Sequence, residues 1–211
     1  MSTRTTTPVV GNDPNPCTIT DNLVRALARP AADSLTTPAY TVTARVLHWI
    51  TALLILFMIS SGVTAANEWG GSWQDSLYDL HKSIGAALII PLVLLRLIYR
   101  WVRPPSQLPN DIPPIQRLAA AVTHWALYAM LVLQPFAGWI ATSAYPAPVP
   151  LFGWITLPAI WFEDRALSDR LFSAHQLIGL AIAFLVVLHV AGSLYHHCVR
   201  KDRVLTRMIT G

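Results

Sequence analysis

Long apolar stretches without a charged residue dominate the chain. Uncharged runs cover residues 46–67, 118–162 and 171–199, and a shorter run at 83–95 continues past the isolated Arg96 and Arg100. A helix that crosses a bilayer needs about 20 predominantly apolar residues. The pattern therefore predicts an all-α membrane protein with four transmembrane helices.

Prolines and polar residues set the limits of these helices. The four helices are expected at about 39–66, 72–101, 115–145 and 168–198. The second ends before Pro104 and Pro105, because proline disfavours helix in the residue before it. Ser72 and Asp75 have the spacing of a capping box, which predicts the start of that helix.

The uncharged run 118–162 is long enough for two spans, but we expect it to hold only one. Pro146, Pro148 and Pro150 interrupt it. The remainder, 151–162, is too short to cross a bilayer. Its tryptophans predict a loop at the lipid headgroups.

Composition agrees with this class. Hydrophobic residues make up 54% of the 211 residues and charged residues 12%, with a mean hydropathy of +0.46. Ordinary soluble domains have roughly 25% charged residues. Residues 1–39, rich in Thr and Pro, are predicted to be a disordered cytoplasmic tail, and residues 40–211 the four-helix domain. The net charge of +4 comes without a basic, aromatic-lined face, so no nucleic-acid partner is expected.

Basic residues divide unequally between the two ends of the predicted bundle. With four alternating spans in an up-down bundle, three lie at the end away from the termini: Lys82, Arg165 and Arg170. Nine lie at the end that carries both termini: Arg45, Arg96, Arg100, Arg103, Arg117, Arg200, Lys201, Arg203 and Arg207. The positive-inside rule then places both termini in the cytoplasm.

Histidines provide the candidate chemistry, because ionisable groups in a span usually mark function. His175 and His189 are 14 residues apart, which places them near one face of the fourth helix and roughly 21 Å apart along its axis. His81 enters the second helix from the same side as His175. His48 and His189 lie near the opposite side. The pairs His81 with His175 and His48 with His189 are what two b-type haems, each held by two imidazoles, require.

The other polar residues near the helix ends are assigned separately. Arg96 and Arg100 either pair with the propionates of the inner haem or reach the lipid headgroups. His196 and His197 lie at the cytoplasmic interface, where they either serve a quinone headgroup or anchor the helix. His124 has no partner left at its depth and is predicted to be a structural histidine.

Several segments resemble one family of membrane proteins. They are 40–49 (YTVTARVLHW), 81–85 (HKSIG) with Arg96 and Arg100, Tyr128 with Pro135 and Gly138, 151–153 (LFG), and 188–208 (LHVAGSLYHHCVRKDRVLTRM). The chain resembles, over about residues 40–209, the bacterial cytochromes b561, which are di-haem four-helix membrane cytochromes related to the b subunits of nickel hydrogenases.

The resemblance implies haem ligands at His48, His81, His175 and His189, two haem b groups, and no ligand role for the third-helix His124. It also implies single-electron transfer between a periplasmic donor and ubiquinone or another membrane quinone. Some members resemble superoxide oxidases, and others are thought to serve partner dehydrogenases or hydrogenases as anchors and relays.

The chain departs from the family in its long N-terminal tail and in its outer loops. The loops carry three basic residues against six acidic ones: Glu68, Asp75, Asp79, Glu163, Asp164 and Asp169. A negative surface repels an anion such as superoxide. The resemblance implies a bacterial inner-membrane protein, with the superoxide oxidase type as the leading version of its function. Two alternatives stay open: a relay for a periplasmic dehydrogenase, and, from another class, a divalent-metal transporter with imidazole ligands.

Overall fold

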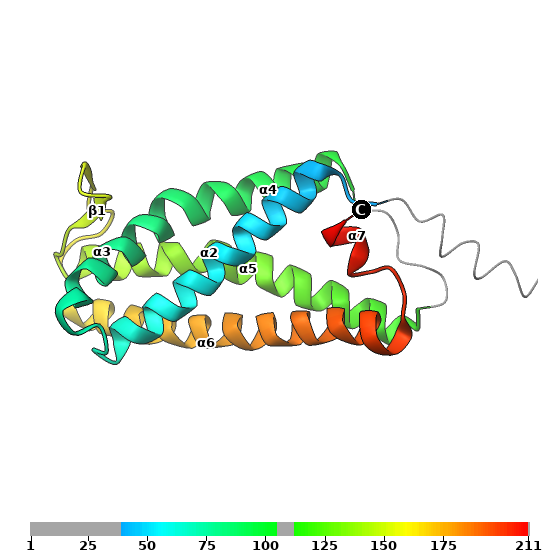
Figure 1. The fold of residues 1–211 in the computed structure, drawn as a ribbon. Coiled ribbons are helices and arrows are strands. Elements are labelled where there is room, and N and C mark those ends of the chain that lie inside the picture. Colours follow the sequence, from blue (N-terminus) through cyan, green and yellow to red (C-terminus); the bar gives the residue numbers. More distant parts are fainter. Residues whose placement is uncertain (1–38, 105–111, 211) are drawn as a thin grey trace, which may run out of the picture.

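The computed structural model describes residues 39–104 and 112–210. Four helical segments are long and apolar enough to cross a membrane: Val42–Ala66, Gly71–Val102, Pro114–Ala144 and Arg165–Arg200. The start of α2 (Val42–Ala66) and the C-terminus lie at one end of the bundle, as Figure 1 shows. The four-helix up-down bundle is thus confirmed. Of the predicted tail, 1–39, only Ala39 lies within the described residues.

The second span covers Gly71–Val102, close to the predicted 72–101, but it is not one regular α-helix. It comprises a 3₁₀ turn at Gly71–Trp73, α3 (Gln74–Ile84), a π-helical turn at Gly85–Ile89 and α4 (Ile90–Val102). Pro91, just inside α4, has no N–H to donate to the carbonyl four residues earlier. The regular α-helical hydrogen bonding is therefore interrupted at Pro91, and the π-helical turn lies just before this proline.

The predicted capping box at Ser72 is wrong. Trp73 occupies the N-cap position of α3 and makes no side-chain capping bond. The Gln74 side chain replaces it: its Oε1 accepts from the Gly70 N–H at 2.9 Å, and its Nε2 donates to the Ala65 carbonyl at 2.8 Å. The start of α3 is therefore tied to the end of α2.

The third and fourth spans lie close to their predicted limits. α5 (Pro114–Ala144) continues through Pro135, and α6 (Arg165–Tyr195) is extended by a π-helical turn, His196–Arg200. The Asp164 carboxylate caps α6 by accepting from the Leu167 N–H at 3.0 Å, which stabilises an N-terminus three residues earlier than predicted.

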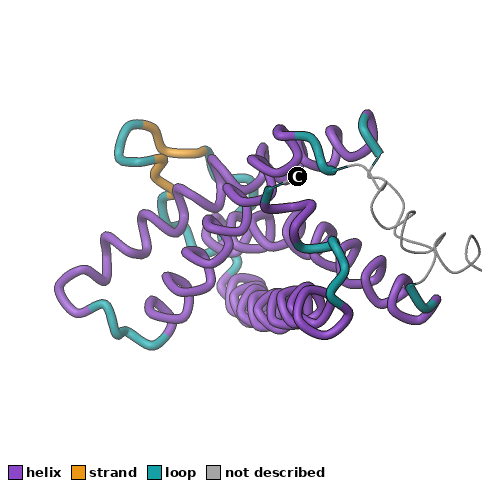
Figure 2. Tube along the Cα trace, turned by 45° about the vertical axis from the view of Figure 1, so that its right-hand side comes forward, coloured by secondary structure: helices purple, strands orange, loops and turns teal. Residues whose placement is uncertain are grey.

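Between α5 and α6, residues predicted to form a loop contain a β-hairpin. β1 (Val149–Leu151) pairs antiparallel with β2 (Ile155–Leu157), orange in Figure 2. Phe152 and Gly153 both have positive φ, as a type I′ turn requires. The buried Ser83 Oγ accepts from the Phe152 N–H at 3.0 Å, so the hairpin is fixed to α3.

The centre of the bundle is apolar and receives residues from every span. Its buried members are Ile55, Ile84, Ile89, Val93, Leu131 and Ile182. Many other apolar side chains face outward, such as Leu53, Leu180 and Val187 at 62% to 65% exposure. A soluble protein rarely exposes so large an apolar surface, whereas a bilayer solvates it. The small core separates two levels at which histidines meet.

The C-terminus folds back over the start of the first span. Beyond Lys201, whose φ is 55°, the chain turns into α7 (Thr206–Ile209). The buried Arg207 guanidinium lies 5.2 Å from the centre of the Tyr40 ring, and Trp49 Nε1 donates to the Met208 carbonyl at 3.1 Å. This end of the bundle therefore has a fixed polar structure beside the ends of α2 and α6.

Candidate functional site

Four of the predicted site histidines lie in two pairs. The ring centres of His81 and His175 are 6.1 Å apart, and those of His48 and His189 are 6.0 Å apart. Each pair joins two helices that are distant in the sequence. The two pairs lie at different depths, since His175 and His189 are both on α6 and 14 residues apart, roughly 21 Å along the helix axis.

These separations fit one iron between each pair of imidazoles. A metal–imidazole bond is about 2 Å long and the nitrogen lies roughly 1 Å from the ring centre, so two rings on opposite sides of one iron have centres about 6 Å apart. No group of three His, Cys, Asp or Glu side chains suited to a metal ion occurs in residues 39–104 and 112–210. The geometry therefore fits a cofactor that leaves two axial positions for the protein better than a bare metal ion.

The hydrogen bonds of the outer pair fix one tautomer of each ring. His175 Nδ1 lies 3.1 Å from the Gln134 backbone oxygen, which can only accept, so Nδ1 carries the proton. His81 Nδ1 lies 3.0 Å from Ser61 Oγ, whose own proton goes to the Met58 carbonyl at 3.2 Å. Ser61 therefore accepts from His81. Both rings keep the Nε2 lone pair for a metal, as is usual for ligating histidines.

Two glycines make room for the outer rings. A Cβ atom on Gly62 would lie 3.1 Å from His81 Cε1, and one on Gly138 would lie 3.0 Å from His175 Cε1. The sequence analysis named Gly138 only among the residues that resemble the cytochrome family, and nothing in the sequence pointed to a role for Gly62. Three glycines follow a pair histidine by three or four residues in the sequence: Gly85, Gly179 and Gly192. A Cβ atom on any of them would meet no histidine ring, because the nearest side chains are Met58 for Gly85 and Gln134 for Gly179, and Gly192 has nothing within 4 Å.

Gln134 and Ser61 are further residues of the outer site that the sequence analysis missed. Gln134 Nε2 donates to the His175 backbone oxygen at 2.8 Å, so this residue holds both the backbone and the ring of His175. Its buried Oε1 has no hydrogen-bond partner in the described residues. Polar residues in the interior of a span were the available signal, since they are expensive there unless they have a role.

The inner pair has a different hydrogen-bond arrangement. Arg96 Nη2 lies 3.2 Å from His48 Nδ1 and, as an obligate donor, places that nitrogen in the acceptor role. Neutral His48 then carries its proton on Nε2. Binding a metal through Nε2 requires the Arg96 N–H to leave Nδ1. The Arg96 guanidinium also lies 5.6 Å from the centre of the Tyr128 ring.

His124 lies at the inner level, beside His189, which the predicted pairing had already assigned to His48. Its ring centre is 5.0 Å from that of His189, with the planes at 76°. His124 Nδ1 donates to the Ala120 carbonyl at 2.7 Å, as expected of a structural histidine. His124, on α5, reaches the level of His189 because α5 and α6 pack against each other along much of their length (Figure 1). At 5.0 Å the two rings are in direct edge contact.

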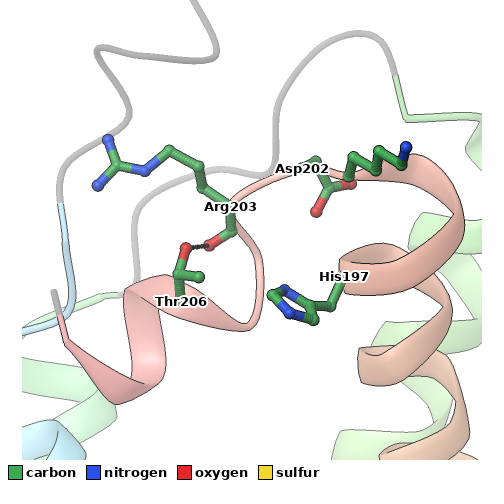
Figure 3. A pocket seen from close by; sticks show the side chains of 5 residues that line it. His197, Asp202, Arg203 and Thr206 are labelled. Atoms are coloured by element: carbon green, nitrogen blue, oxygen red, sulfur yellow. Dashed lines mark hydrogen bonds between the residues drawn. The ribbon is translucent and has the colours of Figure 1, made fainter.

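The remaining predicted residues lie at the inner end. The Arg100 guanidinium is 5.8 Å from the centre of the Trp125 ring and 6.0 Å from that of Tyr128. His196 Nδ1 is 2.6 Å from Asp202 Oδ2, whereas His197 lines a hollow beside α7 (Figure 3). His196 and His197 therefore belong to two different environments at the end of α6.

Comparison with known proteins identifies the family. The family described as prokaryotic cytochrome b561 matches residues 39–211. The chain belongs to this family. It is therefore a multi-pass bacterial membrane protein, a b-type cytochrome that binds haem b and takes part in electron transfer.

Individual cytochromes match over most of their length. Cytochrome b561 homolog 2 of Escherichia coli is 32% identical over 174 residues, which cover 81% of this chain and 90% of the relative. The probable superoxide oxidase CybB of Yersinia pestis is 29% identical, covering 77% and 91%. Cytochrome b562 of Cereibacter sphaeroides is 28% identical, covering 82% and 96%. The cytochrome domain thus accounts for all four spans of the described chain.

Proposed function

We propose that this cytochrome holds two haem b groups and carries single electrons between the periplasmic face and a membrane quinone. His81 and His175 would hold the outer haem, and His48 and His189 would hold the inner one. The observation that carries the proposal is the presence of two histidine pairs with ring centres 6.0 and 6.1 Å apart at two depths. The haem irons supply the one-electron chemistry, while the protein sets ligation and potential.

The residues around the outer pair orient its ligands. Ser61 and the Gln134 carbonyl accept from Nδ1 of His81 and His175, which keeps each Nε2 free for iron. Such hydrogen bonds also raise the basicity of the ligand. Gly62 and Gly138 leave space for the rings to hold this orientation.

Arg96 and Arg100 serve the inner haem. The Arg96 guanidinium donates to His48 Nδ1, and the Arg96 side chain is long and flexible enough to turn from this ring to a haem propionate. The guanidinium groups of Arg96 and Arg100 both lie over the Tyr128 ring. Arginine pairs well with carboxylates through two parallel hydrogen bonds. The same movement frees His48 Nδ1 to become a donor, so propionate binding and ligation by His48 support each other.

The quinone is placed at the cytoplasmic end, near His196 and His197. The distribution of basic residues supports a cytoplasmic location for both termini. His196 follows His189 by seven residues, or about 10 Å along the helix. A ubiquinone headgroup at this level lies next to the inner haem site and within reach of cytoplasmic protons.

Superoxide and a partner enzyme are two candidate electron donors. The relative named as a probable superoxide oxidase supports superoxide. The acidic outer end favours a periplasmic dehydrogenase or hydrogenase, with this cytochrome as its anchor and relay. Asp79 and Glu163 pair there with Lys82 and Arg165 at 2.9 and 3.9 Å, so the basic side chains of that end are partly neutralised.

Purified protein separates these possibilities. Reduced-minus-oxidised absorption spectra with iron counted per polypeptide test for two haems. Formation of quinol from superoxide and ubiquinone by the isolated protein supports the superoxide oxidase, whereas a relay needs its partner enzyme and stays inactive alone.

A further inference from the structure

The helical segment that carries His81 is separated from the rest of its span. α3 ends at Ile84, and the π-helical turn Gly85–Ile89 follows before α4 begins. Such turns are rare and are frequently found at functional sites. Near its start, α3 is tied to α2, because the Tyr78 hydroxyl donates to the Ala65 carbonyl at 3.1 Å. The position of α3 therefore depends on contacts with segments other than α4.

Ser83, two residues after His81, binds the turn of the β-hairpin. Its Oγ lies 2.7 Å from the carbonyls of Pro150 and of Asp79 in its own helix, and it accepts from the Phe152 N–H at 3.0 Å. Ser83 is only 2% exposed, so water does not replace these bonds. Phe152 has a φ of 53°, which is unfavourable for a bulky residue. Ser83 thus holds a backbone conformation that the hairpin alone does not favour.

Lys82 makes a second contact with the same hairpin. Its Nζ donates to the Pro148 carbonyl at 3.2 Å and pairs with the Asp79 carboxylate at 2.9 Å. β1 lies beside α3 at the outer end of the bundle (Figure 1). Two sequence segments that resemble the cytochrome family, 81–85 and 151–153, therefore meet in the structure.

The loop that contains the hairpin is also fixed to α5. The Ser143 Oγ, on a residue that is 4% exposed, accepts from the Ile160 N–H at 3.2 Å. α5 in turn orients His175, through the Gln134 carbonyl and the space left at Gly138. The loop therefore joins the helix of one outer histidine to the helix that orients the other.

We propose that Lys82 and Ser83 are positioning residues for the outer haem. Their bonds to the hairpin, which we call the hairpin clamp, set the position of His81 relative to His175. This inference rests on the proposed function, because it takes these two histidines as the outer ligands. Their ring planes are 73° apart. With α3 and α5 fixed to one loop, this angle and the separation of the rings are maintained.

Electron paramagnetic resonance of the oxidised holoprotein tests the hairpin clamp. The signal of a low-spin haem depends on the angle between its two imidazole planes. Ser83→Ala leaves the Phe152 N–H without its acceptor, a loss that corresponds to about tenfold in an equilibrium constant. We expect a shifted outer haem signal and about tenfold greater loss of that haem to apomyoglobin. The inner haem should keep its signal and its affinity.

Three further variants separate positioning from general destabilisation. Lys82→Met removes the Pro148 contact, and Ser143→Ala removes the anchor on α5, so both should change the outer haem in the same direction. Ser173→Ala, at the outer end of α6, is the matched control. Within the described chain, Ser173 Oγ donates to the Asp169 carbonyl of its own helix and contacts no other segment. This variant should keep the wild-type signal and haem content.

The possible outcomes are distinct. An unchanged outer haem signal and unchanged haem retention in both Ser83→Ala and Lys82→Met would overturn the hairpin clamp. Equal loss of both haems would overturn it too, since these residues would then serve only the general fold. If Ser83→Ala is not produced, Lys82→Met decides, because Lys82 is partly exposed and its loss is easier to tolerate.

His81→Ala tests the proposed function separately. If this variant keeps the outer haem, the ligand assignment fails, and the hairpin clamp fails with it. If it loses the outer haem while Ser83→Ala and Lys82→Met behave as the wild type, the ligand assignment stands and only the hairpin clamp fails.

Discussion

His175 Nδ1 lies 3.1 Å from the backbone oxygen of Gln134, and this contact between α6 and α5 decides which nitrogen of His175 is free. Because the carbonyl can only accept, the Nε2 lone pair points away from it. Ser61, on α2, contacts Nδ1 of His81 in the same way and leaves the Nε2 of that ring free. The outer site is therefore organised for ligation by residues on two helices that supply no ligand to it.

Replacing Ser61 with Ala should weaken outer haem binding. The variant removes the acceptor from His81 Nδ1, and loss of such a contact typically costs 10- to 100-fold in metal affinity. Transfer of haem to an excess of apomyoglobin measures the loss. Ser60→Ala is the matched control, because Ser60 Oγ only donates to the Leu56 carbonyl of its own helix. Equal haem retention in both variants would contradict the role of Ser61.

Gly138→Ala should disturb the outer haem through His175. The added Cβ would lie 3.0 Å from His175 Cε1 and 3.2 Å from Nδ1, so the ring has to move. Overpacking of this kind typically costs about 1–3 kcal/mol of stability. The expected result is a lower outer haem content and a lower unfolding temperature. Gly192→Ala, where a Cβ would meet nothing within 4 Å, should leave both unchanged.

His124 should orient the inner ligand without being one. Its ring meets the His189 ring edge-on at 5.0 Å, which leaves no space for an iron between them. His124→Ala should therefore retain two irons per chain but change the electron paramagnetic resonance signal of the inner haem, since the His189 plane is released. His124→Phe, which keeps a ring, should restore most of the signal. Loss of one iron from His124→Phe would make His124 a ligand instead.

Arg96→Gln should lower the midpoint potential of the inner haem. A nearby positive charge favours the reduced iron, which carries one charge less than the oxidised iron. We expect a decrease on the order of 60 mV, which corresponds to a tenfold change in a one-electron equilibrium. A redox titration followed by absorbance measures it. Arg96→Lys should show a smaller decrease, and an unchanged potential in both variants would exclude Arg96 from the inner haem environment.

The helices and their order could be predicted because the bilayer imposes a simple pattern. A span needs a long apolar run, and the sequence has three that are uncharged and a fourth, beginning at 83–95, that continues past Arg96 and Arg100. The pairs of His81 with His175 and of His48 with His189 followed from depth along the helix. Depth is set by residue count alone, so it does not depend on side-chain packing.

The details that the sequence did not reveal depend on contacts between distant segments. The His124 ring reaches His189 because of how α5 packs on α6, and residue count does not give the rotation of a helix. Ser61 and Gln134 have roles only because His81 and His175 face them across helix interfaces. Asp202 belongs to the matching segment 188–208, but its contact with His196 was not predicted. That contact forms because the chain reverses after Lys201, whose left-handed φ of 55° the local sequence does not require.

The most direct test of the account is the number of haem irons per chain in the wild type and in His189→Ala. We expect two low-spin haems with two imidazole ligands each in the wild type, and one, the outer haem, in the variant. Spectra and iron analysis on the same samples give both numbers. A wild type with fewer than two such haems, or a His189→Ala variant that keeps both, would contradict it.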